Sequence, residues 1–179
     1  MLAKEPRILK KLQKEVDLLP ELNVETTRNC TYLAAVVNEA LRLCNPLPSG
    51  AYAATPPSGV QVAGTFIPGN TQVIVSHLGL MTDERYFPRG EEFVPERWTR
   101  EWDEGIAEKK AFVPFGYGLH SCVGKQLALN EMKLGIASVV RQFDVVLGES
   151  YSEDVWQEEW KDYAVLQVGA LPVKFLERA

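Results

Sequence analysis

A single cysteine in a glycine-rich stretch constrains this chain more than any other feature. The stretch runs from Phe112 to Gly124 and places Cys122 directly before a helical pattern. The apolar residues behind it recur at three- and four-residue steps, as on one face of a helix: Ala128, Met132, Gly135, Ile136, Val139, Val140 and Phe143. Cys122 is therefore predicted to lie at the N-terminal end of a helix.

This position favours the thiolate form of the cysteine. Unpaired backbone N–H groups and the positive end of the helix dipole both stabilise a nearby negative charge. A thiolate acts as a nucleophile or as a metal ligand. Gly116, Gly118 and Gly124 allow positive φ and remove side-chain bulk, so a large or flat ligand can lie close to the main chain. We interpret the stretch as a ligand-binding loop.

The spacing inside the loop is more specific than its composition. Phe115-x-x-Gly118-x-His120-x-Cys122-x-Gly124 resembles the haem-binding signature of the cytochrome P-450 family, Phe-x-x-Gly-x-(Arg or His)-x-Cys-x-Gly. Agreement at all of these positions is rare by chance, because one of them requires a scarce cysteine. The loop therefore indicates one family among the classes that use a reactive cysteine.

Two further motifs resemble the same family and occur in the same order. Glu39-x-x-Arg42 lies in a helical pattern, and residues 93–98 read Phe-x-Pro-Glu-Arg-Trp, which includes Arg97. A lone Glu-x-x-Arg pair is more often a surface ion pair worth at most ~1 kcal/mol. Beside the cysteine loop, however, the resemblance implies that Glu39, Arg42 and Arg97 form a buried ion-pair cluster. This cluster would lock the long irregular passage that contains residues 93–98 beneath the haem.

The resemblance also implies a role for each residue of the loop. Cys122 would be the catalytic residue and the metal ligand, because its thiolate would bind the iron of haem (iron protoporphyrin IX) and favour O–O cleavage. Phe115 would pack beside the sulfur, and His120 would reach a haem propionate, where many family members use arginine. A loop histidine without this role is the alternative for His120. The full expected cofactor-binding set is Cys122, His120, Phe115, Gly116, Gly118 and Gly124.

The rest of the sequence predicts a mainly helical chain with small β-sheets (α+β). An apolar stripe predicts a helix over residues 3–19, and a second helix that ends before Asn45-Pro46 has Thr26, Thr27 or Asn29 as its N-cap. Strands are expected at residues 52–54, 60–62, 71–75, 143–147, 164–168 and 173–176, and a short helix at residues 77–81. Residues 149–162 have no clear pattern. By resemblance, this is the carboxyl-terminal part of the cytochrome P-450 fold.

The chain is predicted to be a single partial domain, residues 1–179. Its first helix starts abruptly, and the resemblance covers only the carboxyl-terminal third of a complete family member. The amino-terminal majority, including the distal oxygen-activating helix, would then be absent. Glu25-Thr26-Thr27 offers an acid beside an alcohol, but a position just before a helix favours capping instead.

Composition and spacing argue against several other classes. The net charge of -5 and the lack of a basic stripe disfavour nucleic-acid binding. The three cysteines are far apart, which disfavours a disulfide framework, and no apolar run is long enough to predict a membrane span. The loop lacks the spacing of cysteine phosphatases, phosphate loops and zinc sites. A cysteine-nucleophile hydrolase would need a base, and no sequence feature assigns one.

By resemblance, the chain is part of a fungal-like haem-thiolate monooxygenase. Such an enzyme inserts one oxygen atom from O2 into a small apolar organic substrate, which residues 47–52 would border. Electrons would come from NADPH through an NADPH-cytochrome reductase. The reductase would dock on the thiolate side, where the resemblance places four lysines: Lys109, Lys110, Lys125 and Lys133. The alternative is that these lysines are ordinary solvated surface residues. The alternative is a non-catalytic truncated remnant that cannot hold haem without its distal half. Eukaryotic family members usually reside at the endoplasmic reticulum membrane, and the location of this chain stays open.

Overall fold

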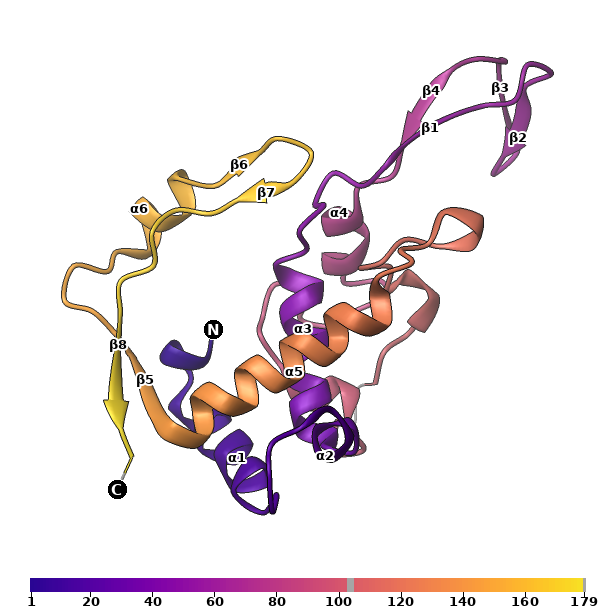
Figure 1. Cartoon of the computed structure of the whole chain (residues 1–179). Helices are drawn as coiled ribbons and strands as arrows, with labels where there is room; N and C mark the ends of the chain where they lie inside the picture. The colour runs from indigo at the N-terminus through magenta and orange to yellow at the C-terminus, as the bar shows by residue number, and fades with distance from the viewer. Residues whose placement is uncertain (103–104, 179) are drawn as a thin grey trace.

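A computed structural model describes residues 1–102 and 105–178, and it combines a helical core with small antiparallel sheets (Figure 1). The helices are α1 (Pro6–Asp17), α2 (Val24–Arg28), α3 (Thr31–Leu43), α4 (His77–Thr82), α5 (Lys125–Gln142) and α6 (Glu153–Glu158). The strands are β1 (Tyr52–Ala54), β2 (Val60–Val62), β3 (Thr65–Ile67), β4 (Gln72–Ile74), β5 (Phe143–Leu147), β6 (Lys161–Asp162), β7 (Leu166–Gln167) and β8 (Val173–Glu177). Short 3-10 turns cover Leu2–Lys4, Pro95–Trp98, Lys109–Ala111 and Gly118–His120. This is the α+β architecture that the sequence predicts.

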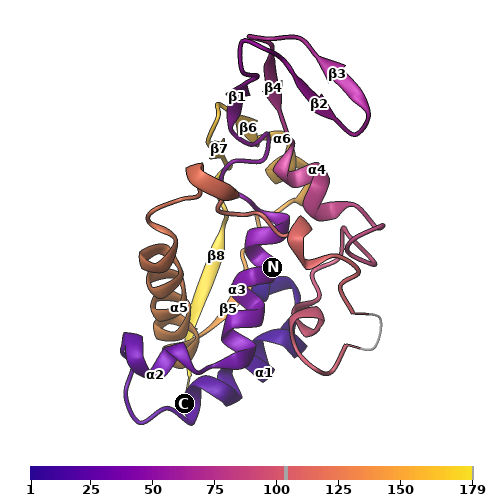
Figure 2. The ribbon, with the colours of Figure 1, turned by 90° about the vertical axis from the view of Figure 1, so that its right-hand side faces the viewer.

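The core lies where α1, α3 and α5 pack together. Figure 2 shows α3 and α5 side by side, with α1 and α2 near the same end of both. Its buried apolar side chains include Ile8, Leu9, Leu12, Val16, Leu33, Val36, Val37, Leu41, Ala137 and Val140. Burial of one such large side chain contributes about 1.5–3 kcal/mol, so the apolar stripes that predict these helices also stabilise their packing.

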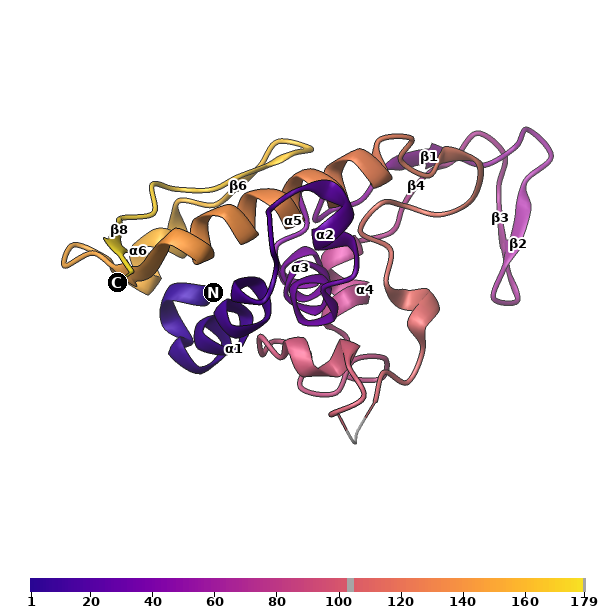
Figure 3. The same ribbon diagram turned by 60° about the horizontal axis from the view of Figure 1, so that its bottom comes forward.

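Helix α3 is the central element of the molecule. It contacts α1 and α5 on one side, and α4 and the Pro95–Trp98 turn on the other (Figure 3). The sheets lie farther out. In Figure 1 the pairs β1–β4 and β2–β3 extend from one end of the core, whereas β5–β8, β6–β7 and α6 lie together at the other. In the described residues, no helix is both long and apolar enough to cross a membrane.

The start of the chain differs from its prediction in two details. The first helix begins at Pro6 instead of residue 3, because proline lacks an N–H and fits the first turn of a helix. The predicted polar connection contains α2, a helix of one turn that the sequence did not reveal. Asn23 and Thr26 cap it reciprocally, at 2.9 Å and 3.1 Å, so Thr26 has a capping role at this helix.

The predicted N-cap of α3 is wrong. Cys30, and none of Thr26, Thr27 and Asn29, occupies the N-cap position, and it makes no side-chain capping bond. The carboxylate of Glu15 on α1 instead accepts hydrogen bonds from the backbone N–H groups of Tyr32 and Leu33, at 2.9 Å and 2.8 Å. A carboxylate satisfies these donors as a local cap would, but it comes from another helix.

The predicted set of strands also needs two corrections. Strand β3 was not predicted; it pairs with β2 across Ala63 and Gly64, whose φ values of 49° and 82° suit a tight hairpin turn. The strand predicted at residues 164–168 is shorter, because Ala164 has a φ of 70° in the turn between β6 and β7. Helix α6 lies in the segment that showed no pattern. The strands predicted at residues 52–54 and 71–75 correspond to the pair β1–β4, and those predicted at residues 143–147 and 173–176 correspond to the pair β5–β8.

Candidate functional site

The cysteine loop is closed by its own backbone. The N–H of Cys122 donates a hydrogen bond to the carbonyl of Phe115 at 2.8 Å, which brings the two ends of the loop together. Gly116 and Gly118 have φ values of 70° and 74°, a region that disfavours residues with a Cβ. The glycines therefore allow the reversal that places Cys122 beside Phe115, two residues before Gly124, the N-cap of α5.

Cys122 lies in a groove of about 340 Å³, a volume within the range of small-molecule sites. The groove is lined by Leu41, Pro46, Leu47, Ala51, His77, Pro114, Phe115, Gly116, His120, Cys122, Ala128 and Met132. The structure thus brings four of the predicted cofactor-binding residues into one groove. Gly118 and Gly124 adjoin it without lining it. Cys122 is a free thiol and is exposed, and its role as an iron ligand stays a prediction.

The lining of the groove suits an apolar group that binds through sulfur. Its walls are mostly apolar, and a soft thiolate is a suitable ligand for haem iron. A Cβ built on Gly118 would meet nothing within 4 Å, so the loop leaves open space on this side. Around it, Leu119 and Val123 are fully exposed, at 100% and 104%. Exposed apolar side chains grouped in this way mark a surface that is covered by a ligand or by another part of a protein.

Sequence reasoning missed His77, which also lines this groove. Its Nδ1 atom is buried and has no hydrogen-bond partner among the described residues. Burial lowers the pKa of His77 below its usual value, which favours the neutral imidazole. No local motif marks this residue, because α4 reaches the groove only through tertiary packing.

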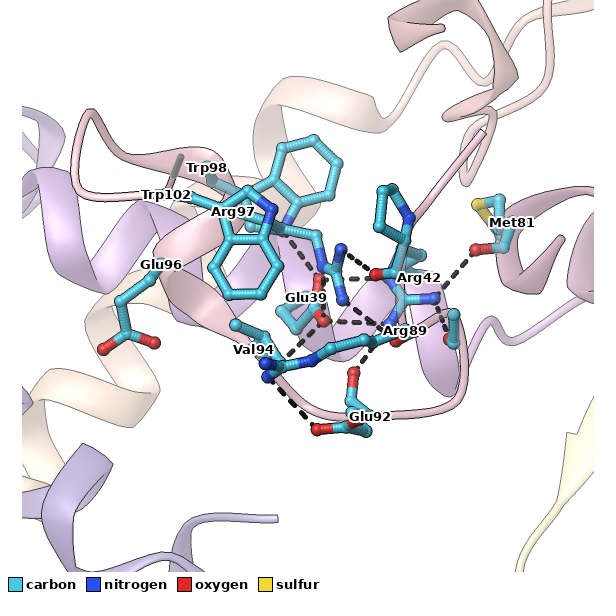
Figure 4. A network of polar contacts seen from close by, with 12 residues as sticks. Glu39, Arg42, Met81, Arg89, Glu92, Val94, Glu96, Arg97, Trp98 and Trp102 are labelled. Carbon is cyan, nitrogen blue, oxygen red and sulfur yellow. Dashed lines mark hydrogen bonds and ion pairs between the residues drawn. The ribbon is translucent and has the colours of Figure 1, made fainter. Parts of the chain in front are cut away.

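Glu39, Arg42 and Arg97 form a buried cluster on the opposite side of α3 from α5 (Figure 4). Arg42 donates to both carboxylate oxygens of Glu39, at 3.0 Å and 2.9 Å, and Arg97 Nε donates to Glu39 Oε1 at 2.9 Å. All three side chains are completely buried. The surface ion pair that a lone Glu-x-x-Arg usually forms is therefore not what this chain contains.

The cluster holds the irregular passage that follows α4 and contains residues 93–98, and it fastens this passage to α3. Arg42 donates to the carbonyls of Met81, Gly90 and Glu92. Arg97 donates to the carbonyls of Pro88 and Arg89, at 2.8 Å and 3.1 Å. Glu39 also accepts from the backbone N–H of Val94 and from the Trp98 indole, at 2.9 Å and 2.8 Å. Because the passage has few backbone bonds of its own, these side chains replace a sheet or helix in holding it.

Burial lowers the pKa of Arg97, whereas the charge of Glu39 and its hydrogen bond raise it. A guanidinium keeps its proton at any ordinary pH, so the buried charges of the cluster remain paired. Removal of either partner would leave an uncompensated charge in the interior, which costs about 3–5 kcal/mol.

Glu96 belongs to a second network that the sequence did not reveal. In Figure 4 it points away from the cluster, and its carboxylate accepts from Arg7 on α1 at 2.8 Å and from the Tyr32 hydroxyl at 2.9 Å. Burial opposes ionisation of Glu96, but the bonds from Arg7 and Tyr32 outweigh it and hold its pKa at about 2. This residue therefore connects the Pro95–Trp98 turn to α1 and α3.

Asn45 connects the end of α3 to the cysteine loop. Its side chain is 1% exposed, donates to the carbonyl of Pro114 at 3.2 Å and accepts from the N–H of Leu47 at 2.7 Å. Pro114 belongs to the loop, and Leu47 begins the segment 47–52 that is predicted to border a substrate. Leu47 and Ala51 of that segment do line the groove, so one amide positions both of its walls.

The structure separates the four predicted docking lysines. Lys109 and Lys110 lie in a 3-10 turn before the loop, and Lys125 is the first residue of α5, with its Nζ 5.9 Å from the centre of the Phe115 ring. Lys133 lies two turns farther along α5 and is half-buried. A role in binding a redox partner stays a prediction for all four.

Comparisons with known proteins give one consistent result. The sequence model of the family described as "Cytochrome P-450" matches residues 1–168. A cytochrome P-450 monooxygenase of Penicillium fellutanum, phqL, is 37% identical over 173 residues, which cover 97% of this chain and 31% of that protein. A cytochrome P-450 monooxygenase of Aspergillus oryzae, aclL, is 34% identical over 177 residues, which cover 97% of this chain and 36% of that protein. The chain thus spans about a third of the length of these curated relatives.

A solved structure shows the same fold. The crystal structure of a cytochrome P-450 heme domain superposes with a TM-score of 0.85 at 24% sequence identity. The match covers 99% of this chain and 38% of the crystallised chain. Helices and small sheets are therefore arranged here as they are in part of that heme domain.

Proposed function

The chain belongs to the cytochrome P-450 family, and from that premise we propose that it is the haem-binding portion of a haem-thiolate monooxygenase. The observation that carries the proposal is the free, exposed thiol of Cys122 in an apolar groove beside a glycine-shaped loop. The chain forms a single partial domain, in which the cluster of Glu39, Arg42 and Arg97 holds the irregular passage that leads to this loop.

Each residue of the groove has a distinct role in the proposed binding of haem. Cys122 would hold the iron through its sulfur, and its backbone hydrogen bond to Phe115 keeps the loop in the shape that presents this sulfur. His120 offers a polar contact on the same loop. When bound, a thiolate-ligated haem supplies the cleavage of O2 and the transfer of one oxygen atom to an organic molecule. Leu47 and Ala51 give the groove an apolar wall that excludes water and suits an apolar substrate.

The electrons for this reaction come, in our proposal, from NADPH through an NADPH-cytochrome reductase. The exposed lysines Lys109, Lys110 and Lys125 precede or begin the elements that carry Cys122, so they offer positive charge on the thiolate side. The parent enzyme is expected at the endoplasmic reticulum membrane. The reductase is proposed from family membership and this placement of charge, whereas the location is proposed from family membership alone.

A second candidate function is favoured by the exposed surface around the loop. Tyr117, Leu119, Val123 and Leu127 are between 63% and 104% exposed next to Cys122. In a protein about three times as long, other segments cover such a surface. On its own the chain is then a non-catalytic remnant that cannot retain haem.

The carbon-monoxide difference spectrum of the haem-supplemented, dithionite-reduced chain distinguishes the two candidates. The Cys122→Ala variant tests the ligand, and Cys44→Ala is the matched control, because Cys44 is a free cysteine outside the groove. A strongly red-shifted band in the unmutated chain and in Cys44→Ala, lost in Cys122→Ala, is the expected result. A flat spectrum from the unmutated chain would favour the remnant.

A further inference from the structure

The unpartnered imidazole of His77 is the most informative feature of the groove outside the cysteine loop. Buried polar atoms in proteins are nearly always hydrogen-bonded, and each exception calls for an explanation. His77 Nδ1 is such an exception among the described residues, and the His77 side chain lines the groove that contains Cys122. Because no hydrogen bond among the described residues fixes its tautomer, the ring can place its N–H on the nitrogen that a ligand in the groove reaches.

The backbone around His77 holds the ring in place. Gly50 has a φ of 80°, and a Cβ there would lie 2.1 Å from the carbonyl oxygen of Val75 and 3.1 Å from Cδ2 of His77. The N–H of Leu78 donates to the carbonyl of Pro48 at 2.9 Å. The turn around Gly50 is thus packed tightly against the start of α4, and the ring cannot easily turn away to find another partner.

The charge of the groove suggests which partner fits. Haem carries two carboxylates on one edge of the ring, and a carboxylate near apolar walls needs a hydrogen-bond donor. Neither Lys nor Arg is among the described residues that line the groove, which leaves the imidazoles of His77 and His120 as its side-chain nitrogen donors. His120 is exposed, whereas His77 is half-buried and fixed.

We propose that His77 donates a hydrogen bond to a carboxylate of the haem that binds through Cys122, an inference that rests on the proposed function. A neutral imidazole carries one N–H and can place it on either nitrogen. His77 is then a positioning residue, because it fixes the orientation of the ring edge without touching the iron. The sequence motif does not include it.

The test measures porphyrin affinity, not activity. Haem and its dimethyl ester, in which both carboxylates are blocked, are titrated into the unmutated chain, His77→Phe and His77→Gln, with the Soret band as the readout. His77→Phe keeps a planar ring without a donor, and we expect it to weaken haem binding roughly 10- to 100-fold. Binding of the dimethyl ester should not change, and His77→Gln, which retains an N–H donor, should recover most of the affinity for haem.

Three outcomes separate this contact from the proposed function. Equal weakening of haem and its ester by His77→Phe would show a purely structural role and overturn the contact. If His77→Phe changes neither affinity, the contact is also overturned. The proposed function would still stand in that case, provided that the unmutated chain shows the thiolate band and Cys122→Ala loses it. If the unmutated chain binds neither porphyrin, both inferences fail. Metal-free protoporphyrin IX titrated into Cys122→Ala gives a second measurement, in which the effect of His77→Phe should persist without any iron–sulfur bond.

Discussion

The ion-pair cluster and the cysteine groove lie on different sides of the same helix and differ in how completely their polar groups are satisfied. In the cluster, both oxygens of Glu39 accept hydrogen bonds, and both guanidinium groups bond to carboxylate and to backbone carbonyls. In the groove, Cys122 is exposed and His77 Nδ1 has no partner in the described residues. The polar groups of the cluster are thus satisfied within the described residues, whereas those of the groove are not.

Arg97→Ala should have the largest effect on stability, because it leaves a buried carboxylate short of a partner. We expect a loss of about 3–5 kcal/mol in the free energy of unfolding, enough to release the irregular passage and abolish haem incorporation. Urea denaturation followed by circular dichroism measures this. The matched control is Arg85→Ala, since Arg85 pairs with Asp83 at the surface, where solvent screens an ion pair and its contribution to stability is small. Equal losses in the two variants would contradict the comparison.

Glu96 makes the stability of the scaffold depend on pH. Its pKa of about 2 in the folded chain lies below the ordinary value of 4.5, so its contribution is full above pH 4.5 and is lost as the pH falls toward 2. We expect Glu96→Gln to lower the free energy of unfolding by about 2–3 kcal/mol at pH 6 and by much less at pH 3. Urea titrations at the two pH values check this. A Glu96→Gln effect that does not change with pH would contradict the ionic role of Glu96.

Asn45→Ala should have an intermediate effect and would connect the two regions. The substitution removes two buried hydrogen bonds, to Pro114 and Leu47, and should cost about 1–2 kcal/mol. Because these bonds position both walls of the groove, porphyrin affinity should fall by more than stability alone explains. Hydrogen exchange of the Leu47 amide reports the loss directly. Unchanged exchange at Leu47, with normal porphyrin binding, would exclude the link.

Cys122→Ala should have the smallest effect on stability and a complete effect on the thiolate band. An exposed side chain contributes within about 0.5 kcal/mol, so the free energy of unfolding without haem should hardly change. A buried cysteine offers the contrast: Cys30→Ala, at 4% exposure, should destabilise the chain more. A large loss of stability in Cys122→Ala would mean that the loop has a structural role that its exposure does not reveal.

The sequence alone determined the features that depend on neighbours along the chain. The apolar stripes of α1, α3 and α5 predict helices, because residues three and four positions apart share one face. The spacing around Cys122 predicts a tight glycine loop before α5, since glycine adopts a positive φ, such as that of Gly116 and Gly118, at the least cost. The motif of Glu39, Arg42 and Arg97 indicated a family, and with it the cluster that the structure contains.

Tertiary structure alone decided the features that depend on partners far away in the sequence. Glu15 on α1 caps α3, Glu96 meets Arg7, and His77 enters the wall of the Cys122 groove. No short window of sequence contains both members of such a pair, so neither periodicity nor spacing can reveal them. A local pattern encodes an element and its buried face, whereas the burial and pairing of a single polar group are set only when distant elements pack together.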